Sequence, residues 1–112
     1  MKDKVNKFIT DSNMKPLTHF ARIADIQSEL GELSKELLKA TAYGEKDLTL
    51  NDDIKMEFGD TLFAILALAK ELNINPDKCL DEALAKYRRR LALTGNIGNN
   101  IEVPIINEIE KL

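Results

Sequence analysis

The chain has few of the residues that form disulfide frameworks and soft-metal sites. Its 112 residues include one cysteine, Cys79, and one histidine, His19. A lone cysteine cannot form an internal disulfide, and a lone histidine cannot form a histidine metal cluster. Tryptophan is absent and aromatic residues make up 5% of the chain, so we expect a core of Leu, Ile and Ala. We interpret His19 as structural and Cys79 as a small buried apolar residue.

Long apolar runs and a large excess of one charge are also missing. The longest apolar run, residues 62–69, is far shorter than the ~20 residues that cross a bilayer. A net charge of -3 argues against bulk attraction to nucleic acid or anionic membranes, although a few cations could hold a small anion. Residues 1–13 lack the apolar core of a signal peptide. We therefore expect a cytoplasmic protein that binds neither nucleic acid nor membrane.

The hydrophobic pattern predicts an all-α chain. Apolar residues at helical spacing predict a long helix from Pro16 to about Ala42, with Gly44 as its stop signal. Two more helices are predicted over residues 51–73 and 76–93. A short helical segment, which ends near residues 11–13, precedes the long helix. We expect a single domain over residues 1–112, with its core at about 16–94 and an irregular tail over 95–112.

The same pattern indicates that one chain cannot bury all of its apolar surface. The predicted buried side of the longest helix consists of Leu17, Phe20, Ile23, Leu30, Leu33 and Leu37. Residues 62–69 are apolar on every side, so this helix must be enclosed by other helices. Because a short chain supplies few neighbours, we predict a helical bundle of three main helices plus a short N-terminal helix. A homodimer or homotetramer would complete its four-helix bundle.

Each of the two central predicted helices carries a stripe of carboxylates. On the first helix they follow spacings of four, three and four residues: Asp25, Glu29, Glu32 and Glu36. At ~100° per residue they fall within a stripe about 60° wide. On the second helix three carboxylates share one face, which small residues continue: Asp53, Glu57, Asp60, then Ala64 and Ala67. If the helices pack antiparallel, the middles of the two stripes face each other.

Two facing carboxylate stripes indicate a bound cation. Like charges at these spacings cost a few tenths of a kcal/mol per pair, and more in a partly buried cleft. Oxygen ligands without His or Cys favour Mg²⁺, Mn²⁺ or Ca²⁺. The predicted ligands are Glu29, Glu32, Glu57 and Asp60. The alternative is a solvated acidic face whose charge is balanced by Lys35, Lys39 and Lys55.

A basic cluster occupies one side of the predicted helix over residues 76–93. Its members are Lys86, Arg89 and Arg90, whereas Arg88 points elsewhere. Arg and Lys are natural partners of phosphate oxygens. The same cations could instead complement the helix dipole, and Glu82 could pair with Lys86. Beside a metal site, the cluster suggests a ligand with a metal-bound polyphosphate.

Two motifs, in this order, resemble those of the MazG-like nucleoside triphosphate pyrophosphohydrolases. They read Glu29-Leu-Gly-Glu32-Leu and Glu57-Phe-Gly-Asp60-Thr-Leu-Phe-Ala-Ile. The segment over residues 75–90, which ends in Lys-Tyr-Arg-Arg-Arg, resembles the closing helix of the family. The resemblance covers residues 16–94. It implies an α-helical dimer or dimer of dimers, with four-helix bundles formed between subunits.

The resemblance also implies an activity and the residues that carry it. Mg²⁺, with Mn²⁺ as a possible substitute, would be held by Glu29, Glu32, Glu57 and Asp60. A (deoxy)nucleoside triphosphate would be cleaved to monophosphate and pyrophosphate, with Lys86, Arg89 and Arg90 on its phosphates. Glu32 is one candidate to accept the proton of the attacking water. Two alternatives remain, namely a phosphoribosyl-ATP pyrophosphohydrolase and a non-catalytic helical binding or regulatory module.

Overall fold

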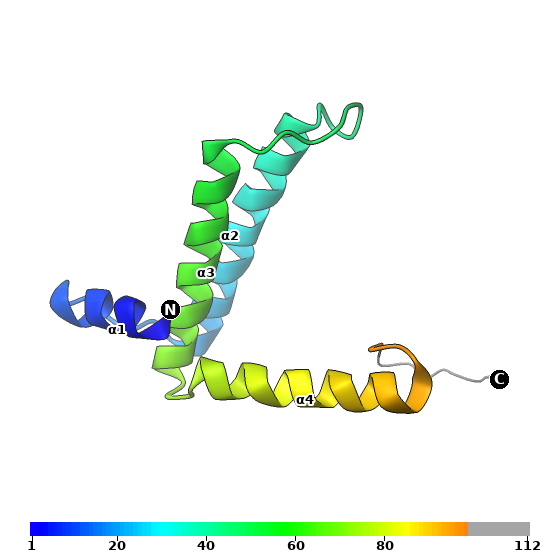
Figure 1. Cartoon of the computed structure of the whole chain (residues 1–112). Helices are drawn as coiled ribbons and strands as arrows, with labels where there is room; N and C mark the ends of the chain where they lie inside the picture. Colours follow the sequence, from blue (N-terminus) through cyan, green and yellow to red (C-terminus); the bar gives the residue numbers. More distant parts are fainter. Residues whose placement is uncertain (99–112) are drawn as a thin grey trace. The chain divides into compact units, whose positions relative to one another are not determined.

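The structure, a computed structural model, describes residues 1–98, which form four α-helices and no strand (Figure 1). They are α1 (Lys2–Asp11), α2 (His19–Ala40), α3 (Asp52–Glu71) and α4 (Pro76–Thr94). This confirms the predicted all-α class, while most of the predicted irregular tail lies outside the described residues. No helix in the described part is long and apolar enough to span a bilayer. The chain divides into two compact units, Met1–Pro76 and Asp77–Leu112, which we describe separately.

Helix α2 begins at His19, three residues later than predicted from Pro16. Thr18 is the N-cap, and its side-chain oxygen accepts a hydrogen bond from the Ala21 N–H at 3.2 Å. The Leu17 N–H donates to the carboxylate of Glu71 at 3.1 Å. The helix start predicted at Pro16 is therefore wrong, because Thr18 caps the helix and a distant carboxylate holds the preceding residue.

Helix α3 starts where its sequence predicts. The Asn51 side chain accepts a hydrogen bond from the Ile54 N–H at 2.8 Å. Asp52 and Asp53 lie in the first turn, where negative charge interacts favourably with the helix dipole. A cap of this kind typically stabilises a helix by about 1 kcal/mol. The N-terminal end of α3 is therefore well defined, with Asp52 five residues before Glu57 and eight before Asp60.

In the first unit, α2 and α3 lie side by side and antiparallel, joined by residues 41–51 (Figure 1). Helix α1 packs against α3, where the rings of Phe8 and Phe63 meet edge to face with centroids 5.8 Å apart. Helix α3 is therefore the central helix of this unit. Its acidic face can meet the acidic face of α2, as the sequence predicts.

Helix α3 carries the buried apolar side chains of the first unit. They are mostly small: Ile54, Ala64, Leu66, Ala67 and Ala69. The side of α2 predicted to be buried is largely open, since Phe20 is 79% exposed and Leu30 is 50% exposed. That prediction is wrong for this unit, because only α1 and α3 are available to cover the surface of α2. Among residues 1–98, no large side chain is fully buried.

In the second unit, α4 carries no buried residue in its described length. Cys79 is exposed, so its predicted burial is wrong. The helix starts at Pro76, as its sequence predicts, because proline at a first helical position sacrifices no hydrogen bond.

Candidate metal centre

Three of the predicted metal ligands meet at the interface of α2 and α3. Glu29 comes from α2, and Glu57 and Asp60 come from consecutive turns of α3. Each offers one carboxylate oxygen, and these oxygens all lie within 4.8 Å of one another. Glu29 and Glu57 are half-buried, whereas Asp60 is exposed. We call these three residues the carboxylate cluster.

The carboxylate cluster is electrostatically unfavourable by itself. Partial burial raises the pKa of Glu57, and the negative charges of Asp60, Glu32 and Glu29 raise it further. Burial also raises the pKa of Glu29, with added contributions from Asp60, Asp25 and Glu32. Within residues 1–98, none of the cluster's carboxylates forms an ion pair with a Lys or Arg. A bound cation would relieve this repulsion.

The lysines that could balance a solvated acidic face contribute little here. Lys39 lies 3.4 Å from the Glu36 carboxylate, at the far end of the α2 stripe. Lys35 and Lys55 form no ion pair with the described acidic residues. The geometry therefore favours a cation site over a face neutralised by lysines.

Glu32, the fourth predicted ligand, does not belong to the cluster. It lies on α2 one turn after Glu29 and is exposed. Its negative charge still raises the pKa of Glu29 and of Glu57. The charge of Glu32 therefore acts on the cluster, although its side chain is not one of the three that meet there. Its role as a metal ligand stays a prediction.

The cluster fits a hard divalent cation. Two oxygens on one Mg²⁺ can be at most about 4.2 Å apart, twice the metal–oxygen distance, and about 4.8 Å for Ca²⁺. The separation of up to 4.8 Å between the cluster oxygens is thus within one small side-chain adjustment of a shared ion. Carboxylate oxygens are also the ligands that Mg²⁺, Mn²⁺ and Ca²⁺ prefer. Glu29, Glu57 and Asp60 would hold such an ion.

The predicted phosphate-binding cations belong to the second unit. The Lys86 ammonium lies 4.9 Å from the centroid of the Tyr87 ring, and Arg89 is exposed. An Arg90 Nη1–H donates to the Ile97 carbonyl at 3.1 Å. These contacts lie within the second unit, which is described apart from the carboxylate cluster. Phosphate binding by these cations stays a prediction.

The sequence analysis missed a buried arginine next to the acidic stripe. The Arg22 side chain is only 4% exposed and donates to two carboxylates. Its Nε and Nη2 groups bind both oxygens of Glu71 at 2.7–3.2 Å, and Nη1 binds Asp25 at 2.8 Å. The hydrogen bonds from Arg22 lower the pKa of Glu71. The available signal was a cation three residues before Asp25 on the α2 stripe.

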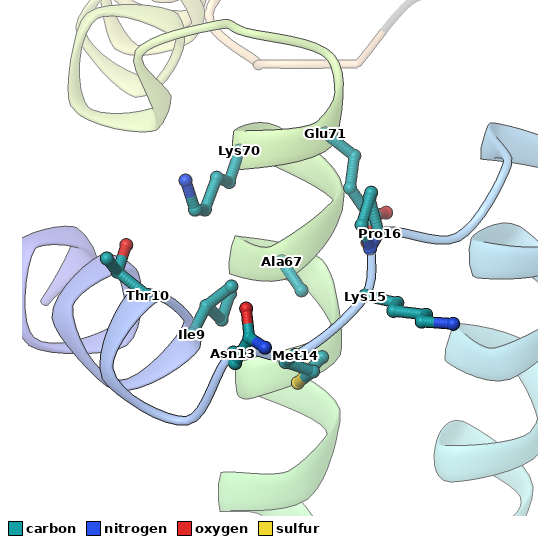
Figure 2. Close-up of a pocket in the computed structure, with 9 residues that line it drawn as sticks. All are labelled: Ile9, Thr10, Asn13, Met14, Lys15, Pro16, Ala67, Lys70 and Glu71. Atoms are coloured by element: carbon teal, nitrogen blue, oxygen red, sulfur yellow. The ribbon is translucent and has the colours of Figure 1, made fainter.

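A cavity of about 280 Å³ lies apart from the carboxylate cluster (Figure 2). Its wall includes Ile9 at the end of α1, Pro16 in the following connection, and Ala67 on α3. Glu71 is the one acidic residue in this wall, and its side chain points toward Pro16 (Figure 2). A single carboxylate already bound by Arg22 does not make a metal centre. The cavity therefore gives no competing metal site.

Comparison with known proteins identifies the family. Residues 17–92 match the MazG nucleotide pyrophosphohydrolase domain. The chain belongs to this family, as its motifs indicate. It is similar to the uncharacterized protein YpjD of Bacillus subtilis (strain 168), with 32% identity over 96 residues. That alignment covers 80% of this chain and 85% of YpjD.

A solved structure extends the similarity to the fold. The crystal structure of YpjD from Bacillus subtilis, described as a candidate pyrophosphatase, matches with a TM-score of 0.65 and 29% identity. The match covers 80% of this chain and 90% of that chain. The family match spans both units of this chain, since it extends from residue 17 to residue 92.

Proposed function

We propose that this protein is a nucleotide pyrophosphohydrolase that requires a divalent cation. It cleaves a (deoxy)nucleoside triphosphate between the α- and β-phosphates, with Mg²⁺ as the natural cation and Mn²⁺ as a substitute. The observation that carries the proposal is the convergence of Glu29, Glu57 and Asp60 without a balancing cation in the described residues. Family membership supports the class of reaction.

The proposed reaction adds one water across a phosphoanhydride. The water oxygen forms a bond to one of the two phosphorus atoms of the α–β anhydride, and the bond from that phosphorus to the bridging oxygen breaks. The products are a monophosphate and pyrophosphate. The divalent cation, when bound, neutralises charge on the phosphate oxygens. The carboxylate cluster holds that cation between α2 and α3. Glu32, exposed one turn from Glu29, accepts the proton that the water loses.

The basic side of α4 is proposed to bind the remaining phosphate charge. Lys86, Arg89 and Arg90 lie within five residues of each other on α4. Guanidinium groups bind phosphate oxygens through paired hydrogen bonds. In this role they would act on substrate binding more than on the chemical step.

We also propose that the protein works as a homodimer or homotetramer. In the first unit, large apolar side chains on α2 and α3 remain exposed, including Phe20 at 79%, Phe58 at 60% and Leu30 at 50%. Each of these side chains would stabilise an interface by about 1.5–3 kcal/mol when fully buried. Light scattering at micromolar concentration tests this proposal directly. A well-folded monomer would contradict it.

The activity is tested with a panel of nucleotides and Mg²⁺, measuring pyrophosphate and monophosphate. The panel contains ribonucleoside and deoxynucleoside triphosphates together with phosphoribosyl-ATP. Glu57→Gln should lower turnover by orders of magnitude, because it removes one metal ligand at nearly constant size. Glu45→Gln is the matched control, since Glu45 is an exposed carboxylate in the connection after α2.

Each other outcome of this assay overturns part of the proposal. Release of inorganic phosphate with a diphosphate product would place cleavage at a different bond. Turnover of phosphoribosyl-ATP alone would assign the alternative substrate. Absence of hydrolysis across the panel would indicate a binding or regulatory module. Equal activity of Glu57→Gln and wild type would remove the carboxylate cluster from the mechanism.

A further inference from the structure

The most buried charge in the described chain sits in the same interface as the carboxylate cluster. Arg22 is 4% exposed, and the Glu71 side chain that it binds is 9% exposed. The guanidinium engages both oxygens of Glu71 and, at the same time, one oxygen of Asp25. We call Arg22, Asp25 and Glu71 the Arg22 network. A cation on α2 is thereby tied to the last residue of α3.

The Arg22 network and the carboxylate cluster lie on the same faces of the two helices. On α2, Arg22 precedes Glu29 by seven residues, or two helical turns of about 5.4 Å each. On α3, spacings of four, three and four residues lead from Asp60 to Glu71 through Ala64 and Ala67. Those two alanines are 2% and 0% exposed. Between the two sites, helical spacing therefore places only the small side chains of Ala64 and Ala67 on this face of α3.

This arrangement restricts how α2 can slide along α3. A planar guanidinium that binds a carboxylate with two donors accepts only a narrow range of positions. The alanine side chains on this face of α3 offer little shape to resist a shift along the helix axis. Glu71 also accepts the Leu17 N–H at 3.1 Å, so the chain entering α2 is held at the same point. The contact between Arg22 and Glu71 thus sets the position of α2 along α3, and with it the position of Glu29 relative to Glu57 and Asp60.

We propose that Arg22 is a positioning residue for divalent-cation binding. By binding Glu71 and Asp25 together, it fixes the register of α2 against α3 and keeps the three cluster carboxylates within reach of one ion. It also occupies Asp25, the next carboxylate on the α2 stripe, so that Asp25 is not a ligand. This inference rests on the proposed metal centre and adds a residue that contacts neither metal nor substrate.

Binding of Mn²⁺ to the full-length protein, measured by calorimetry or electron paramagnetic resonance, tests the proposal. Arg22→Met alone leaves Glu71 buried without its partner and could prevent folding. The decisive variant is therefore Arg22→Met with Glu71→Met, which removes both charges, leaves the net charge unchanged and keeps the interface filled. We expect its Mn²⁺ dissociation constant to rise about tenfold or more, as for other groups that orient metal ligands. Its melting temperature without metal should stay near that of wild type.

Two further variants separate positioning from general effects. Lys7→Met with Asp11→Met removes an exposed ion pair on α1 and, like the Arg22→Met, Glu71→Met variant, leaves the net charge unchanged. Its Mn²⁺ dissociation constant should stay within about twofold of the wild-type value. Arg22→Lys keeps the charge but cannot bridge both carboxylates with paired donors, so its affinity should fall between wild type and the double variant.

The outcomes distinguish this proposal from the proposed function. If Glu57→Gln weakens Mn²⁺ binding but the Arg22→Met, Glu71→Met variant binds like wild type, the metal centre stands and the positioning role of Arg22 is overturned. If wild type binds no Mn²⁺, or Glu57→Gln binds it as tightly as wild type does, the metal centre is wrong and the positioning role falls with it.

Discussion

Arg22 and Glu71 are 49 residues apart in the sequence, yet an Arg22 Nη2–H lies 2.7 Å from a Glu71 oxygen. This contact joins the first turns of α2 to the end of α3. It is an ion pair between two different helices of the first unit. The exposed pairs Lys2–Asp3 and Lys7–Asp11 each lie within α1 and contribute little to stability. The Arg22–Glu71 contact is thus expected to dominate the charge-dependent stability of the first unit.

Stability should depend on pH through Glu71. Because Arg22 lowers the pKa of Glu71 in the folded state, this carboxylate stabilises the fold above its unfolded pKa, near 4.3. That contribution is lost as the pH falls through the lower, folded-state pKa. Glu71→Gln should therefore destabilise the protein at pH 7, by roughly 3 kcal/mol for a broken buried pair. Its deficit relative to wild type should shrink as the pH falls below 4.

Chemical denaturation at pH 7 and at pH 3 measures both values. Asp3→Asn is a suitable control, because Asp3 is an exposed carboxylate with a lowered pKa that pairs with its neighbour Lys2. Its effect should be small at either pH. A deficit for Glu71→Gln that stays constant from pH 7 to pH 3 would show that the Glu71 charge is not what stabilises the fold.

The basic side of α4 should act on substrate binding. Arg89→Glu is expected to raise KM about tenfold or more while changing kcat less, since a charge-assisted hydrogen bond typically contributes about 1.5–3 kcal/mol. Arg88→Glu is the matched control, because Arg88 is exposed and helical spacing places it on a different side of α4 from Lys86, Arg89 and Arg90. Steady-state kinetics with the best nucleotide of the panel gives both constants. If Arg89→Glu leaves KM and kcat intact, the cations of α4 serve the helix dipole alone.

The sequence predicted the start of a helix correctly where the residues that fix that start are neighbours in the chain. Asn51, where the sequence predicts that this helix begins, caps α3. The start of α2 was misplaced because Pro16 is a good first-turn residue, whereas the hydrogen bond from Leu17 to Glu71 holds this segment outside the helix. That bond depends on a contact over 54 residues, and no local pattern encodes it.

The carboxylate cluster was largely predictable, because helical periodicity places its two α3 members on one face of that helix. Spacings of three and four residues align Glu57 and Asp60 on α3, and only the antiparallel pairing with Glu29 had to be assumed. The burial of Arg22 was not predictable in this way, since its partner lies on another helix. The predicted burial of Phe20 was wrong because periodicity identifies an apolar face but not what covers it.

Without metal, the wild-type protein should be limited in stability by its own carboxylates. Because burial and neighbouring charges raise the pKa of Glu57, its contribution to stability is present below about pH 4.3 and is lost as the pH rises through the folded-state pKa. Glu57→Gln removes the ionisable group, and with it the loss of stability that its ionisation causes. In chelator at pH 7, the variant should be as stable as wild type or slightly more stable. Wild type should also lose more stability than the variant between pH 4 and pH 7.

Denaturation curves in chelator, at fixed protein concentration, check this expectation. Glu45→Gln again serves as the control, since Glu45 is an exposed carboxylate in the segment that connects α2 to α3. A metal-free Glu57→Gln protein that is clearly less stable than wild type at pH 7 would identify Glu57 as a stabilising partner in the fold.

The central claim is that Glu29, Glu57 and Asp60 together hold a divalent cation. The most direct measurement is the rise in melting temperature caused by Mg²⁺ in wild type and in Glu57→Gln. At 100 times its dissociation constant, the ion should stabilise wild type by about 2.7 kcal/mol per independent site, or roughly 10 °C. The variant should gain much less, and Glu45→Gln should gain as much as wild type. An equal Mg²⁺-dependent rise in wild type and Glu57→Gln, or none in wild type, would contradict the claim.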